Sequence, residues 1–165
     1  MISLFSRIIR PGLLGLSKTD LRNIGRAAIA EAGYSWHRRY KSFHFQIFAF
    51  AKYGYRKRTK KYEQRKKREH PEAQGRPLVF SGNSERSAMA SNIVRAAATS
   101  FDRFQARVSI NAPTLNYQKL HDEMTRVTVG EQRQLAEDFR DEFERRLVST
   151  ANQKIVPLEM TVRVG

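Results

Sequence analysis

The amino-acid sequence predicts an α+β fold, and three patterns indicate it. Apolar residues recur every three or four positions over residues 18–52, which is typical of helices. Residues 104–110 alternate apolar and polar side chains, as a half-buried strand does. A capped amphipathic helix is predicted near the C-terminus. We expect an apolar arm over residues 1–17 and one domain over residues 18–165. That domain has an N-terminal helix or helix pair, a small mainly antiparallel sheet, an amphipathic C-terminal helix and a final strand.

The N-terminal arm is apolar and is separated from the rest of the chain by Pro11, Gly12 and Gly15. We expect it to pack on its own domain or on a neighbouring subunit. Three cations and no acid in the first 18 residues are also typical of a mitochondrial transit peptide, which is the alternative. The apolar residues of the arm are Ile2, Leu4, Phe5, Ile8, Ile9, Leu13, Leu14 and Leu16.

Residues 18–52 predict two helices or one interrupted helix. Ser17 or Thr19 can cap the start, where Asp20 lies near the positive end of the helix dipole. Gly33 could end the first helix or only bend it, because a stripe with helical spacing continues beyond it. We interpret that stripe as core or subunit interface and not as a base-stacking platform. Its residues are Trp36, Tyr40, Phe43, Ile47 and Phe50.

The segment over residues 52–76 is strongly basic. It holds eleven Lys and Arg residues against three Glu, a local net charge of +8 out of +15 for the chain. Thr59 can cap a short helix over residues 60–69, whose charges we expect to spread around its surface. Three tyrosines are interleaved among the cations and could stack on bases.

The middle of the chain predicts a small sheet. After Pro77, the apolar run 78–80 predicts the start of a strand, which the turn residues 81–83 end or bend. Residues 84–100 leave helix and strand both open, because their alanines favour a helix and their β-branched residues favour a strand. The strand over residues 104–110 would then form a hairpin with the preceding segment, turning near residues 100–103.

The C-terminal part gives the clearest local pattern. Thr128 and Glu131 have capping-box spacing, which predicts the start of a helix. Leu135, Phe139, Phe143 and Leu147 recur four apart on one face, and the helix should run to about Ser149. Residues 155–164 predict a final strand, at an edge or with a late start because of Pro157.

No catalytic or metal-binding motif occurs in the sequence. It lacks a Gly-rich phosphate loop, a nucleophile elbow and a zinc-binding His motif, and it contains no cysteine. His37 and His44 could share a helix face, but no carboxylate stands beside them. The adjacent Asp122 and Glu123 are expected to be solvated. We therefore expect no enzyme, no cofactor, no metal site and no catalytic residue. The apolar runs are also far below the roughly 18 residues of a membrane span.

The excess of positive charge, with a sequence pI of about 10.7, predicts a polyanionic partner or neutralisation inside an assembly. Lys and Arg near a phosphate backbone give affinity that does not depend on base sequence. An acidic protein surface would satisfy the same cations, and the sequence leaves both partners open. The candidate contact residues are Arg56, Lys57, Arg58, Lys60, Lys61, Arg65, Lys66, Lys67 and Arg68.

The order of several short motifs resembles the virion-morphogenesis family of tailed bacteriophages. The match covers roughly residues 18–148, and its combination is more specific than any one piece. The similar segments are Trp36-His37-Arg38-Arg39-Tyr40, His44-Phe45, Tyr53-Gly54-Tyr55 with Arg58, Tyr62, Arg65, Lys66 and Arg68, Pro77-Leu78-Val79-Phe80-Ser81-Gly82 with Arg86, and Leu120-His121-Asp122-Glu123-Met124 followed by 128–147. Where the family more often shows an apolar residue before its Arg, this chain has Asn83-Ser84-Glu85.

The resemblance implies a structural protein of the phage neck. Such a protein forms a ring of six or twelve copies that joins the portal or adaptor of the head to the tail proteins and lets genomic DNA pass. It implies a place in the virion neck or tail, and in the host cytoplasm during assembly, with no membrane partner. A sequence-independent nucleic-acid-binding protein, such as an organellar ribosomal protein, is the alternative. The candidate subunit-interface residues are Leu4, Phe5, Ile8, Ile9, Trp36, Tyr40 and Phe43.

Overall fold

The computed structural model describes residues 15–90, 94–100, 103–108 and 122–159. In these ranges the chain is mainly helical, with one two-stranded antiparallel sheet, so the predicted α+β class is confirmed. The elements are α1 (Lys18–Tyr40), the 3-10 helix η1 (Lys41–Phe45), α2 (Ala49–Lys52), α3 (Lys60–Glu69), the 3-10 helix η2 (Pro71–Ala73), α4 (Asn83–Ala90), β1 (Val94–Ser100), β2 (Arg103–Val108) and α6 (Val129–Glu159).

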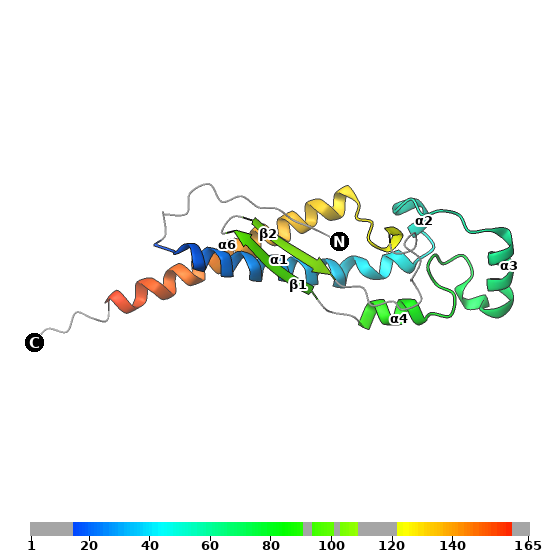
Figure 1. Ribbon diagram of the computed structural model, residues 1–165, viewed down its shortest axis with the longest axis horizontal. Coiled ribbons are helices and arrows are strands. Elements are labelled where there is room, and N and C mark those ends of the chain that lie inside the picture. The colour runs from blue at the N-terminus through cyan, green and yellow to red at the C-terminus, as the bar shows by residue number, and fades with distance from the viewer. Residues whose placement is uncertain (1–14, 91–93, 101–102, 109–121, 160–165) are drawn as a thin grey trace, which may run out of the picture.

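Two long helices form the body of the molecule. α1 and α6 lie side by side and run in opposite directions, and the β1–β2 hairpin packs against α1 (Figure 1). The apolar positions of the three elements meet in one core, which excludes their side chains from water. Its buried members are Ala28, Ile29, Ala32, Trp36, Phe104, Ala106, Leu135 and Phe139.

Gly25 lets the hairpin approach α1 closely. A Cβ atom at this position would lie 2.2 Å from two ring carbons of Phe104 on β2. Because real Cβ atoms do not approach other atoms so closely, the aromatic ring lies in a space that only glycine provides. Phe104 is 1% exposed and is therefore a central residue of the core.

The helix caps form where the sequence predicts them. The backbone N–H of Asp20 donates to Ser17 Oγ at 3.1 Å, and the Asp20 carboxylate accepts from the Ser17 backbone N–H at 2.8 Å. The expected interruption of residues 18–52 is confirmed, but it falls after Tyr40 and not at Gly33. Gly33 is buried inside α1 and does not end the helix.

The hairpin confirms the strand predicted after residue 103. β1 and β2 pair antiparallel with Ser100 opposite Arg103 at the turn. On β2, Phe104 and Ala106 are buried, as the alternation predicted. The segment over residues 84–100 that propensity left open divides into both structures, with α4 ending at Ala90 and β1 beginning at Val94.

Two predicted strands are wrong in the described residues. Leu78 has a φ of 57°, in the left-handed region, so the run 78–80 cannot extend as a strand. Leu78 and Val79 instead fill a core between loops. The final strand fails because residues 155–159 continue α6 past Ser149. The four-residue spacing from Phe143 continues through Leu147 to Ala151, which is buried. Residues 160–165 lie outside the described ranges.

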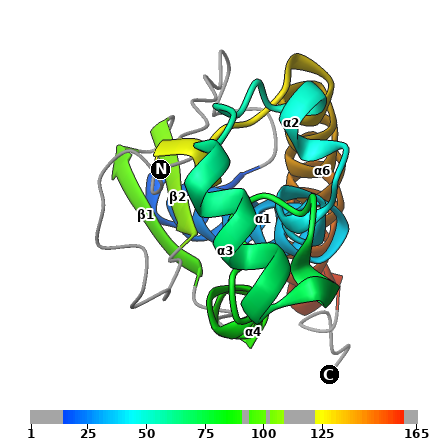
Figure 2. The same cartoon turned by 90° about the vertical axis from the view of Figure 1, so that its right-hand side faces the viewer.

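A second core joins the loops on both sides of α3 to the body. The molecule is elongated, with α3 at one end and the start of α1 near the other (Figure 1). Viewed from that end, α3 lies in front of α1 (Figure 2). The second core holds this end, called the tip below (residues 55–76), in a fixed position. Its buried residues are Phe45, Ala49, Tyr53, Tyr55, Ala73, Leu78, Val79, Ala88 and Met124.

Candidate nucleic-acid interface

The helix α3 has a defined inner side. Thr59 caps its start, since Thr59 Oγ1 accepts from the backbone N–H of Tyr62 at 3.3 Å. The half-buried Tyr62 ring lies 5.7 Å from that of Phe80. Lys66 is 1% exposed, and its ammonium donates to the backbone carbonyl of Arg76. Tyr62 and Lys66 therefore fix which side of α3 faces the protein.

The opposite side of α3 is a cationic face. The expectation that the charges spread around the helix is wrong, because Lys66 is turned inward and the exposed cations share the outer side. Lys66 is for the same reason not available to a partner, although the sequence placed it among the contact residues. We define the cationic face as Lys60, Lys61, Gln64, Lys67 and Arg68, all of which are exposed.

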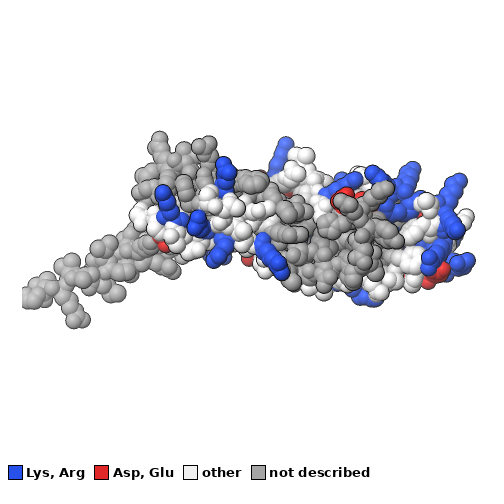
Figure 3. Space-filling model, viewed as in Figure 1, with Lys and Arg blue, Asp and Glu red and all other residues white. Residues whose placement is uncertain are grey.

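Three lysines of the cationic face carry uncompensated charge. Among the described residues, Lys60, Lys61 and Lys67 make no ion pair. Arg65 and Arg68, in contrast, share the carboxylate of Glu69 at 3.0 and 3.3 Å. Arg56 and Lys57 are exposed just before the helix, and Lys and Arg side chains gather at this end in the space-filling view (Figure 3).

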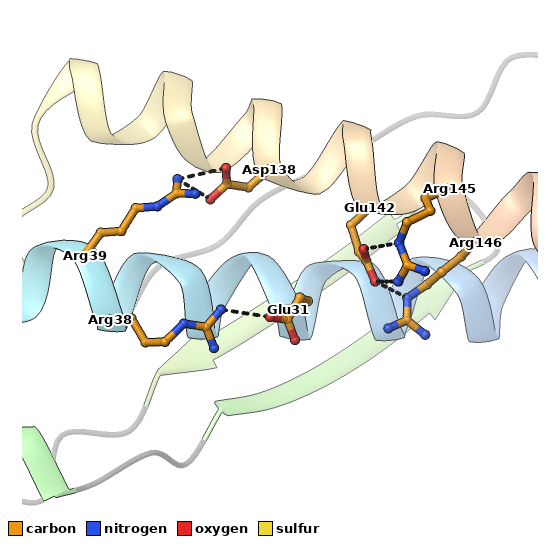
Figure 4. Close-up of polar contacts among 7 residues, drawn as sticks. All are labelled: Glu31, Arg38, Arg39, Asp138, Glu142, Arg145 and Arg146. Atoms are coloured by element: carbon orange, nitrogen blue, oxygen red, sulfur yellow. Dashed lines mark hydrogen bonds and ion pairs between the residues drawn. The ribbon is translucent and has the colours of Figure 1, made fainter.

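On the long helices α1 and α6, several arginines are paired with carboxylates. Arg39 on α1 donates to Asp138 on α6 at 3.0 Å, and Arg38 pairs with Glu31 at 2.9 Å (Figure 4). Glu142 on α6 accepts from two further arginines of the same helix, Arg145 and Arg146 (Figure 4). Asp138 is half-buried at this contact. Arg22 and Arg26 on α1 and Arg133 on α6 are exposed and form no ion pair among the described residues, so the tip differs from the body in gathering its unpaired lysines on one helix.

A buried carboxylate anchors the segment before α3. Glu123 is 3% exposed and accepts from Arg58 Nη1 and Nη2 at 3.3 and 2.5 Å and from the Arg56 backbone N–H at 3.1 Å. Burial alone would raise the pKa of Glu123, but these hydrogen bonds lower it below its ordinary value. The expectation that Glu123 is solvated is therefore wrong. Arg58 serves this internal ion pair and is largely withdrawn from any partner.

Glu131 forms a second buried anchor, at the start of α6. Its backbone N–H donates to Thr128 Oγ1 at 3.2 Å, which confirms the predicted cap. Its carboxylate does not reach back to complete the capping box. It instead accepts from Tyr53 Oη at 2.7 Å and Trp36 Nε1 at 3.3 Å, and pairs with Lys52 Nζ at 2.8 Å. Burial, together with the bond to Glu131, raises the pKa of Tyr53.

Two basic side chains, Lys41 and His44, are buried where the tip meets the body, a region called the junction below. Lys41 is fully buried, with its ammonium 3.4 Å from the Met124 carbonyl, and burial lowers its pKa to about 7. His44 stacks on Tyr53 at a centroid distance of 4.0 Å and shares a short hydrogen bond with the hydroxyl of Tyr55. Burial, followed by the charges of two lysines, lowers the pKa of His44 to about 3. The junction is a close-packed polar joint that positions the tip on the body.

The candidate subunit-interface residues differ in how far they are exposed. Trp36 is 1% exposed and is a core residue of its own chain, so it is not a free interface residue. Tyr40 and Phe43 are half-buried, and the Lys52 ammonium lies 5.2 and 4.4 Å from their ring centroids. Leu4, Phe5, Ile8 and Ile9 lie outside the described residues.

The structure exposes one apolar feature that the sequence did not predict. Ile47 and Phe48 are 65% and 49% exposed in the turn between η1 and α2. Ile47 was assigned to the helical stripe, and Phe48 lies off that stripe. No pattern of spacing predicts this exposure, because it depends on the 3-10 turn that follows α1.

Within the described ranges, no group of three His, Asp or Glu side chains is placed to hold a metal ion. In the same part of the chain, no helix has the length and apolarity of a membrane span. Comparisons of the chain with known protein families, with characterised proteins and with solved structures found no match.

Proposed function

We propose that this chain is a structural protein of the neck of a tailed bacteriophage, assembling as a ring that joins head to tail and lets DNA pass. The cationic face of α3 is the observation that carries the proposal. In the ring, this face lies toward the DNA and neutralises its phosphates. The ordered motifs that resemble the virion-morphogenesis family support the place in the neck.

The geometry of the cationic face fits a phosphate backbone. Lys60 and Lys67 are separated by about 10 Å along the helix axis, given a rise of about 1.5 Å per residue. Ammonium groups on long side chains contact phosphates without reading bases, which suits a channel for DNA of any sequence. The face carries no apolar side chain, and its nearest paired acid is Glu69, which is shared by Arg65 and Arg68. An interface with an acidic protein would normally include an apolar centre, so the phosphate backbone is the favoured partner.

The same face also favours a second candidate, a sequence-independent nucleic-acid-binding protein that acts outside a virion. Both candidates bind DNA through Lys60, Lys61 and Lys67. They differ in assembly, since only the neck protein closes into a ring.

Salt dependence of DNA binding tests the cationic face. We expect log Kd to rise linearly with log salt concentration, with about 0.9 added to the slope for each phosphate neutralised. The variant Lys60→Gln/Lys61→Gln/Lys67→Gln should therefore lower the slope by about 2.7.

A matched variant removes the same charge from the body. Arg22, Arg26 and Arg133 are exposed and lie on α1 and α6. Their replacement by Gln should change the slope by less than about 1, because these positions do not contact phosphates in the proposed mode. Equal effects of the two variants would show that only net charge matters and would remove the support for α3.

A further inference from the structure

A polar groove lies between α1 and α6, at the end of the molecule away from α3 (Figure 1). Its volume is about 420 Å³, which is in the range of sites for small ligands. The polar residues that line it are Asn23 on α1 and Arg145, Arg146, Ser149 and Thr150 on α6. None of the lining residues is acidic, so the groove is a candidate site for an anion.

The carboxylate of Glu142, one turn away on α6, holds both guanidinium groups in place. Arg145 donates to it from Nε and Nη2 at 2.8 and 2.7 Å, and Arg146 donates from Nε at 2.5 Å (Figure 4). In the described part of the chain, Arg145 Nη1 and both Nη groups of Arg146 have no hydrogen-bond partner. Because the guanidinium groups are already fixed, these remaining N–H groups can bind a ligand with little further loss of side-chain freedom.

The charge at the groove is positive. Glu142 balances only one of the two arginines that it holds. Arg22 and Arg26 flank the groove on α1, are exposed, and form no ion pair among the residues that the structure describes. A cleft lined by charge of one sign raises the local concentration of the opposite ion, so this groove attracts anions.

The donors of the groove match a phosphate group. Guanidinium groups bind phosphate oxygens through pairs of N–H groups, and the exposed side chains of Asn23 and Ser149 add neutral donors. A carboxylate has only two oxygens and would satisfy fewer of these donors. The arm before α1 does not match the groove in charge, because residues 1–14 carry two arginines and no acid.

We infer that the groove at Arg145 and Arg146 binds the phosphate group of a small ligand, either free phosphate or a nucleotide. The site goes beyond the proposed function, because it uses neither ring assembly nor the cationic face of α3. Its failure would leave both of those proposals standing.

NMR titration of the ¹⁵N-labelled full-length chain tests the site through the Nε–H signals of Arg145 and Arg146. The probes are inorganic phosphate, adenosine monophosphate and a short DNA duplex, each added at an ionic strength held constant with sodium chloride. We expect the two arginine signals to shift and saturate with phosphate or with the monophosphate.

Two variants that add one negative charge show whether binding is local. Ser149→Asp places a carboxylate among the donors, keeps the ion pairs of Glu142, and should weaken phosphate binding at least about tenfold. Gln132→Glu adds the same charge at an exposed position of α6, about 25 Å away along the helix, and should weaken it less than about twofold. Arg146→Gln removes a donor group and should also weaken binding at least about tenfold.

Absence of saturation with both small probes would overturn the inference. Equal weakening by Ser149→Asp and Gln132→Glu would overturn it as well, since binding would then follow net charge alone. Saturation with the duplex and with neither small probe would show a second contact with nucleic acid in place of a small-ligand site.

Discussion

Replacing the buried Lys41 by Met should stabilise the protein near neutral pH. The ammonium lies in the junction between the tip and the body, where its side chain is 0% exposed. Burial lowers its pKa from 10.5 to about 7, which means that folding disfavours the charged form. Methionine has a similar length and no charge, so it fills the same space without this cost.

The pH dependence has a defined sign. Above pH 10.5 Lys41 is neutral in both states and costs nothing. As the pH falls toward 7, the unfolded chain binds a proton that the folded chain does not, and stability falls by up to about 1.4 kcal/mol per pH unit. Below pH 7 both states are protonated and the cost is constant. At pH 7 the cost of burying the charged Lys41 is about 4 kcal/mol. The Lys41→Met variant avoids this cost but loses the hydrogen bond to the Met124 carbonyl, which is worth about 1 kcal/mol.

Urea denaturation followed by Trp36 fluorescence measures this effect. The wild-type free energy of unfolding should rise by about 2 kcal/mol between pH 7 and 9, and the Lys41→Met variant should be flat over that interval. The window ends at pH 9 because burial raises the pKa values of Tyr53 and Tyr55, which weakens the fold at higher pH. The exposed Lys57→Met variant is the control and should follow the wild type. A Lys41→Met protein less stable than wild type at pH 7 would refute the reasoning.

Four other substitutions test the packing, each through the free energy of unfolding. Gly25→Ala should cost at least about 1–3 kcal/mol, because its Cβ would overlap an aromatic ring of β2, whereas Gly130→Ala in α6 meets no atom and should gain about 0.5–1 kcal/mol. Equal effects would show that the hairpin does not lie on α1. Glu123→Ala should cost about 3–5 kcal/mol, since it leaves Arg58 without its buried partner. A loss near zero there would mean that the anchor is solvated. Phe139→Ala should cost about 3–5 kcal/mol, and a loss below about 1 kcal/mol would place that ring in solvent.

Local patterns predicted the local structure well. Ser17, Thr59 and Thr128 cap helices as their spacing indicated, because a cap depends on only a few neighbouring residues. The hairpin after α4 was predicted for the same reason. The extension of α6 could also have been predicted, since the four-residue spacing continues to Ala151. Pro157 and the β-branched residues near it favoured a strand instead.

The buried polar residues could not be predicted. Lys66 lies on the inner side of α3 because a backbone carbonyl ten residues away accepts from it. Glu123 is buried because Arg58, far away in the sequence, reaches it. Nothing in composition or periodicity reports such partners, since they are brought together only by the tertiary fold. The sequence therefore predicted the candidate site only as a basic segment. The structure divides that segment into internal anchors and an exposed face.

The most direct test of the account is electron microscopy of the purified full-length chain mixed with duplex DNA. We expect closed rings of a single stoichiometry with α3 on the inner rim against the DNA. Monomers at every concentration, or rings whose inner rim is formed by another element with α3 on the outside, would contradict it.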